Sequence, residues 1–125
     1  MPKLDAADAR AIARDYHDIA LSLGAYRFAN WERLSPARRA ELERLQWTLL
    51  TFSSDMTTRA IALEVDDLDA SLSSLKSAVK SLKRAVKHAA DVRSAISAAA
   101  RAVTLGAAIV TGNAVALAAA VGKGS

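Results

Sequence analysis

Apolar side chains recur at alternating steps of four and three residues from Ile61 to Val121. Such spacing is typical of a heptad seam, a narrow apolar stripe along which one α-helix packs against another. Because the stripe is long and narrow, it needs a neighbouring helix along its whole length. We assign these seam residues to contacts between subunits: Leu68, Leu72, Leu75, Val79, Leu82, Val86, Arg93 and Ile96.

Arg93 is the one polar residue in this seam. Its aliphatic stem can lie along an interface while its guanidinium group reaches solvent. Alternatively, a charge at a core position sets the register or the size of a coiled coil. Asp91 or a carboxylate of a partner would then pair with Arg93, and the sequence leaves both interpretations open.

A first helix is predicted near the N-terminus. Asp5 and Asp8 suit its start, because carboxylates stabilise the positive end of a helix dipole. Gly24 suits its end, since glycine readily adopts the left-handed conformation that closes many helices. Residues 25–34 are then a connector, or a short helix that caps one end of a bundle. The apolar face of the first helix comprises Ala9, Ile12, Tyr16, Ile19 and Leu23.

A second helix is predicted to begin at Ser35 and Pro36, as N-cap and first helical residue. A break is expected before the seam, and residues 53–55 and 66–69 are the two candidates for it. We prefer a turn near residues 64–69, because aspartates favour helix starts, and this gives a hairpin of two long helices. The apolar stripe of the second helix comprises Leu42, Leu45, Leu49, Phe52 and Met56.

The composition agrees with a helical fold. A chain of 125 residues has the usual size of one domain, and its many alanines suit close helix packing. We therefore predict an all-α protein of long amphipathic helices, arranged as a helical hairpin or an elongated bundle. Two regions are expected: residues 1–101 as the amphipathic bundle or coiled coil, and residues 102–122 as an apolar helix.

Residues 102–122 contain no charged side chain, and this length is enough to span a bilayer. Arg101 and Lys123 flank the run as candidate interfacial anchors. Its leucine, isoleucine and valine residues supply roughly −2 to −4 kcal/mol of insertion energy, so insertion is marginal and conditional. The residues assigned to this membrane or assembly segment are Val103, Leu105, Gly106, Ile109, Val110, Gly112, Val115, Leu117 and Val121.

The same run has two other possible environments. It can be buried among sister subunits, or it can form the core helix of a monomer. The remaining helices look too poor in apolar surface to cover 21 uncharged residues, so we expect the run to contact lipid or sister copies. Gly112 with Asn113 forms a tight turn or permits close helix contact.

Charge is distributed unevenly along the chain. Residues 1–69 hold nine basic and twelve acidic side chains, whereas residues 70–125 hold eight basic side chains and only Asp91. The basic residues of the seam helix form one face, which is a solvated exterior, a contact for anionic lipid, or a partner for Asp8, Asp15 and Asp18. This basic face comprises Lys76, Lys80, Lys83, Arg84 and Lys87.

No pattern in the chain indicates catalysis. The chain has no cysteine, no metal-binding histidine motif and no phosphate-binding glycine loop, so we predict no catalytic residues, metal or cofactor. Nucleic acid is not favoured as a partner, because the basic face lacks interleaved aromatic residues. Trp31 and Trp47 are interpreted as packing residues rather than a binding cage.

Two functional hypotheses follow. The first is a non-enzymatic membrane-active protein that oligomerises and anchors to or permeabilises a bilayer through residues 102–122, in the manner of a pore-forming or tail-anchored protein. Its layout of long amphipathic helices with one concealed apolar segment resembles α-helical pore-forming toxin components, although no motif matches. The second is a soluble structural or adaptor subunit whose C-terminal helix is buried in an assembly with itself or a helical partner. Without a secretory signal, we expect synthesis in the cytoplasm, then membrane association or export by a non-classical route.

Overall fold

A computed structural model describes residues 6–58 and 68–111. Within these residues every long element is an α-helix and there is no strand, which confirms the all-α fold class. The helices are α1 (Ala6–Ala29), α2 (Pro36–Thr58), α3 (Leu68–Lys87) and α4 (Val92–Thr111), with a short 3-10 helix (Trp31–Arg33) between α1 and α2.

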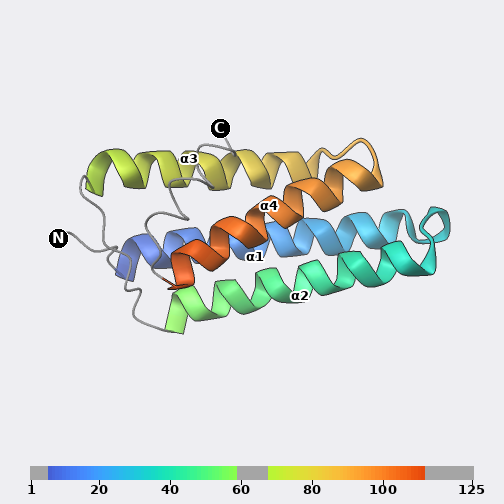
Figure 1. The fold of residues 1–125 in the computed structure, drawn as a ribbon, viewed down its shortest axis with the longest axis horizontal. Helices are drawn as coiled ribbons and strands as arrows, with labels where there is room; N and C mark the ends of the chain where they lie inside the picture. Colours follow the sequence, from blue (N-terminus) through green and yellow to red (C-terminus); the bar gives the residue numbers. More distant parts are fainter. Residues whose placement is uncertain (1–5, 59–67, 112–125) are drawn as a thin grey trace.

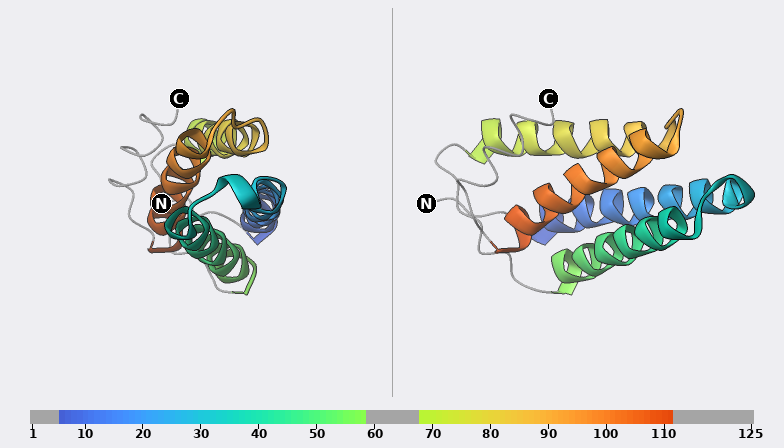
Figure 2. Two further views of the ribbon diagram at one scale, coloured as in Figure 1. Left: turned by 90° about the vertical axis from the view of Figure 1, so that its right-hand side faces the viewer. Right: turned by 45° about the vertical axis from the view of Figure 1, so that its right-hand side comes forward.

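The four helices form an elongated bundle made of two antiparallel hairpins, α1–α2 and α3–α4 (Figures 1 and 2). α1 packs against α2 and α3, and α4 packs against the same two helices, so α2 and α3 lie diagonally opposite. Residues 30–35 and residues 88–91 connect the helices at the same end of the bundle, which we call the turn end (right in Figure 1).

The core is apolar and extends along the inner faces of all four helices. No charged or polar side chain is buried among the described residues. The predicted faces of α1 and α2 point into this core, because their spacing returns to one side of a helix every three or four residues. The largest fully buried side chains are Tyr16, Ile12, Ile19, Leu23, Leu42, Leu49, Met56, Leu75, Leu105, Ile109 and Val79.

The start of α2 matches the sequence prediction. The backbone N–H of Arg38 donates a hydrogen bond of 3.2 Å to the Ser35 hydroxyl, and Pro36 is the first helical residue. This pair satisfies one backbone donor and places proline where no N–H is needed.

The predicted end of α1 at Gly24 is wrong. α1 continues to Ala29, and the side-chain amide of Asn30 donates a hydrogen bond of 2.9 Å to the carbonyl oxygen of Tyr26. At Gly24 the reason for glycine is space, since an added Cβ would lie 2.6 Å from Nε2 of Gln46 on α2.

The seam predicted as one continuous helix from residue 61 is interrupted at residues 88–91. α3 ends at Lys87, and α4 restarts after Asp91, whose carboxylate accepts a 2.8 Å hydrogen bond from the backbone N–H of Ser94. Nothing in the glycine and proline pattern marks this turn, so Asp91 was its only signal. The break preferred near residues 64–69 lies largely outside the described residues, and α3 begins at Leu68.

This interruption also changes the phase of the seam. In α3 the buried side chains include predicted seam residues, whereas in α4 the predicted positions Arg93 and Ile96 are exposed and half-buried. Because the chain reverses and starts a new helix, the buried face of α4 need not continue the heptad spacing of the buried face of α3. The buried face of α4 comprises Ala95, Ala98, Ala99, Ala102, Leu105, Gly106, Ala108 and Ile109.

Candidate functional site

The α3–α4 hairpin holds every described residue that the sequence assigned to a membrane, basic or oligomer surface. α4 lies between α2 and α3, and its inner face is closed by side chains from α1 and α2 (Figures 1 and 2). Tyr16 of α1 donates a buried hydrogen bond of 2.7 Å to the carbonyl oxygen of Ala102. Burial raises the pKa of this phenol, so its proton stays in place at physiological pH.

A glycine lets α4 approach this aromatic layer. A Cβ on Gly106 would lie 2.6 Å from Cδ2 of Phe52 and 2.9 Å from Cε2 of Tyr16. Both distances are shorter than van der Waals contact, so the close approach of α4 depends on the missing side chain.

The predicted membrane or assembly segment is therefore partly enclosed by its own chain. Leu105, Gly106 and Ile109 are buried, whereas Val103 and Val110 are half-buried. The border predicted between residues 101 and 102 lies inside α4 and does not coincide with a helix end. The remaining residues assigned to this segment lie outside the described residues: Gly112, Val115, Leu117 and Val121.

α4 has the length and composition of a membrane-spanning helix. Val92–Thr111 reaches a mean hydropathy of 1.4, and 44% of its most apolar window is buried inside the bundle. Core helices of water-soluble bundles share these properties, so α4 is compatible with either environment. Its outward face carries polar side chains, namely Arg93, Ser94, Ser97, Arg101, Thr104 and Thr111.

Two lysines of the predicted basic face pair with acidic residues of α1. Lys76 Nζ lies 3.0 Å from Asp8 Oδ1, and Lys83 Nζ lies 3.4 Å from Asp15 Oδ1 and 2.9 Å from Asp18 Oδ2. These contacts confirm the pairing that the sequence suggested between the two helices. Because Asp8 to Asp15 and Lys76 to Lys83 are equal steps along parallel helices, the pairs also define the register between α1 and α3.

The hydrogen bond to Asp18 is the main cause that raises the pKa of Lys83, and the nearby charges of Asp18 and Asp15 add to it. Partial desolvation acts in the opposite direction. The side chain of Lys83 remains about one-third exposed, so solvent weakens the pair. Lys80, Arg84 and Lys87 are exposed and form no ion pair within residues 6–58 and 68–111.

Half of the residues of the predicted oligomer seam contribute to the core of the single chain. Leu75, Val79, Leu82 and Val86 are buried in the bundle. Leu68 and Leu72 lie at the start of α3, and their side chains are outside the described part of the structure. Ile96 lies in a shallow groove of ≈ 300 Å³ between α2 and α4, which is lined by Glu41, Arg44, Leu45, Thr48, Ile96 and Ala100.

The titratable residues of the described segments do not gather into a chemical site. No group of three or more histidine, aspartate or glutamate side chains there could hold a metal ion. His17 lies on α1 and His88 lies in the turn between α3 and α4, and both side chains are exposed.

Comparison of the chain with protein-family models, curated proteins and solved structures gives no match.

Proposed function

We propose that this chain is a non-enzymatic, membrane-active helical protein that oligomerises and engages a lipid bilayer through residues 102–122. One observation carries the proposal: the uncharged run begins inside α4, a helix long and apolar enough to span a membrane, whose most apolar window is only 44% buried. The protein would be membrane-associated, and its partners would be lipid and further copies of itself.

In this proposal the bundle is the state that shields the apolar run. Leu105 and Ile109 face the core, and Tyr16 holds the Ala102 carbonyl. Lipid would have to replace these contacts when α4 leaves the bundle. The intrinsic insertion energy is small, roughly −2 to −4 kcal/mol, so insertion depends on additional contacts between copies. Small residues such as Gly106 and Ala107 suit such contacts, because they let helices approach closely.

The second candidate is a soluble structural or adaptor module that binds another helix. It is favoured by the outward face of α4, where Arg93, Ser97 and Arg101 are exposed as in a helix that stays in water. A shallow groove lies between α2 and α4 and contains Leu45 and Ile96. A helix of a partner could bind in this groove through apolar contacts.

Liposome flotation and dye release separate the two candidates. The informative variant is Thr104→Asp, because Thr104 is exposed in the bundle but lies within the uncharged run. Ser97→Asp is its matched control: it places the same charge on the same outward face of α4, one heptad earlier and before the run. Circular dichroism establishes that both variants fold.

Membrane insertion of the run predicts that Thr104→Asp abolishes dye release and that Ser97→Asp leaves it nearly unchanged. A chain shortened to residues 1–111, which keeps the whole of α4, should also lose release. A defined oligomer that ignores liposomes would instead support the adaptor function. Equal dye release by all these variants would contradict insertion through residues 102–122.

A further inference from the structure

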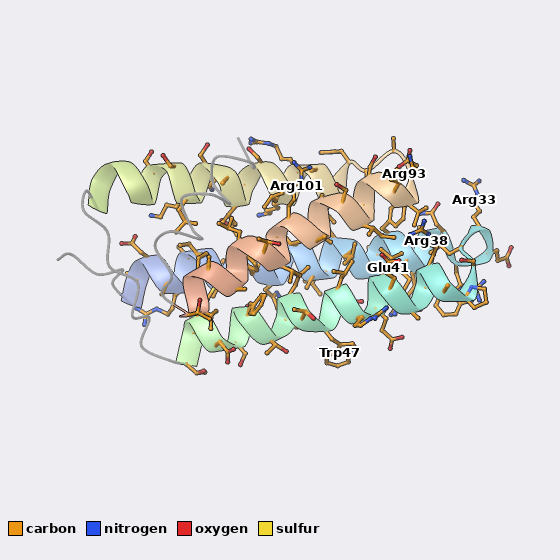
Figure 3. All side chains as sticks on the ribbon, viewed as in Figure 1. Arg33, Arg38, Glu41, Trp47, Arg93 and Arg101 are labelled. Carbon is orange, nitrogen blue, oxygen red and sulfur yellow. The ribbon has the colours of Figure 1, made fainter. Side chains whose placement is uncertain are left out.

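A second surface, unrelated to the apolar run, lies at the turn end of the bundle. Phe28, in the last turn of α1, and Trp31, in the short 3-10 helix that follows, expose 79% and 45% of their surface there. Burying large aromatic side chains is strongly favourable, so two of them held in solvent side by side indicate a contact surface. Arg33 projects from the same connector, beyond the end of the helices (Figure 3).

The connector holds these aromatic residues in a defined place. Arg39 donates hydrogen bonds of 2.9 and 2.6 Å to the carbonyl oxygen of Trp31, and its guanidinium carbon lies 4.4 Å from the centre of the indole ring. Leu34 is buried in the core just behind the short helix. Because the backbone is fixed at both points, the exposure of Phe28 and Trp31 is built into the fold.

The end of α1 and the connector border an open hollow. A hollow of ≈ 740 Å³ is lined by Arg27, Phe28, Ala29, Asn30, Trp31, Glu32 and Arg33. The Nε of Arg27 is buried and has no hydrogen-bond partner, and its Nη1 lies 3.5 Å from Glu43. Because Arg27 Nε is shielded from solvent and its guanidinium pairs with Glu43, Arg33 is the cation of this hollow that is open to an anion.

Basic residues of the other hairpin reach the same end. α3 ends at Lys87 and α4 begins beside Arg93, both at the turn end (Figure 3). Charges from both turns act on Tyr26. Burial is the main cause that raises the pKa of Tyr26, the charge of Asp91 raises it further, and the charge of Arg33 lowers it. The turn end thus combines exposed aromatic rings with the exposed cations Arg33, Lys87 and Arg93, which outnumber the exposed carboxylates Glu32 and Asp91 of the two turns.

We propose that the turn end is a docking site for an anionic lipid surface, in which Phe28 and Trp31 enter the interfacial layer and Arg33 binds headgroup phosphates. Tryptophan prefers the membrane interface, and basic side chains near an anionic surface each add to the attraction. This contact is separate from residues 102–111, which form the second half of α4 and end at Thr111 at the opposite end of the bundle (Figure 1). It anchors the folded bundle without unfolding any helix.

The two tryptophans of the chain provide the test. Trp47 is 64% exposed on the side of α2, away from the turn end (Figure 3), and is a matched control for Trp31. In the full-length chain, Trp47→Phe leaves Trp31 as the only reporter, and Trp31→Phe leaves Trp47. Fluorescence is measured with phosphatidylcholine vesicles, with and without phosphatidylglycerol, that carry brominated acyl chains.

Docking through the turn end predicts a blue shift and bromine quenching of Trp31 on anionic vesicles only, with Trp47 unchanged. Phe28→Ser and Arg33→Glu should each weaken partitioning by about tenfold. Arg10→Glu, the same charge reversal on exposed α1 surface at the other end, should leave it nearly unchanged. The thermal unfolding curve of each variant should match that of the parent.

Three results would overturn the docking site. The first is bound protein whose Trp31 stays unshifted and unquenched, which would leave residues 102–122 as the membrane contact. The second is equal weakening by Arg10→Glu and Arg33→Glu, which would indicate diffuse charge attraction. The third is a chain that ignores anionic vesicles while binding an acidic protein through Phe28.

Discussion

α1 and α2 fill the shared core with larger side chains than α4 does. α1 and α2 supply large side chains, including Tyr16, Leu42 and Leu49, whereas the buried face of α4 consists mainly of alanine. Large residues of α1 and α2 therefore cover the small residues of α4, and the hydrogen bond from Tyr16 to Ala102 joins α1 to α4. The small side chains of α4 therefore let this helix lie close to its neighbours, and the larger side chains of those neighbours supply the volume of the core.

The largest effect should come from removing volume on the α1 side. We expect Tyr16→Ala to lower the free energy of unfolding by about 3–5 kcal/mol, because it leaves a large cavity. Ala99→Gly, an equally buried position in α4, should cost only about 1 kcal/mol through helix propensity. Urea unfolding measures both values. Equal losses would show that the two hairpins contribute alike.

Adding volume at the point of closest approach should have the next largest effect. Gly106→Ala should destabilise the bundle by about 1–3 kcal/mol, since the new Cβ overlaps Phe52 and the fixed ring of Tyr16. Gly24→Ala is the control, because its Cβ meets only the flexible end of Gln46. The melting temperature of Gly106→Ala should be well below that of Gly24→Ala. The reverse order would contradict close packing at Gly106.

The N-terminus of α4 should respond to acid. The hydrogen bonds from Ser94 lower the pKa of Asp91, so its contribution to stability is present at neutral pH and is lost as the pH falls through that pKa. Asp91→Ala should lower the melting temperature at pH 7 and abolish this part of the acid dependence. Asp91→Asn should retain the cap without the titration. Parallel acid profiles for the parent and Asp91→Ala would exclude the cap.

The smallest effect is expected on the α1–α3 face. Lys83→Met should cost less than about 1 kcal/mol, because the pair with Asp15 and Asp18 is partly exposed. The loss should shrink in molar salt, unlike the loss at Tyr16. Since the pKa of Lys83 is raised, its contribution should persist at neutral pH and vanish as the pH rises through that pKa. A salt-independent loss would indicate packing by the lysine stem instead.

The hairpins also differ in how well the sequence predicted them. Ser35 with Pro36 was readable from local capping chemistry, and the stripes of α1 and α2 were readable because large apolar residues recur there at steps of three and four. In α4, alanine occurs on every side, so spacing alone does not distinguish the buried face from the predicted seam. The membrane segment, the basic face and the oligomer seam remain proposals, although Lys76 and Lys83 now have partners within the chain.

The turn end was not readable as a site. Phe28 and Trp31 appear in the sequence as ordinary packing residues of a connector. Their exposure results from Arg39, Asn30 and Leu34, which fix the connector through contacts with α1, α2 and the core. Only a placed backbone distinguishes an aromatic ring that packs from one that faces solvent.

By itself the sequence determined the helical class, the caps with strong local chemistry and the charge pattern that pairs α3 with α1. These depend on neighbours within one or two helical turns, or on complementary charges at matching spacing. The tertiary structure alone decided where the long seam breaks, which face of α4 is buried and which aromatic residues stay exposed. Those features depend on close approach between helices, and local periodicity carries no information about such contacts when the side chains are as small as alanine and glycine.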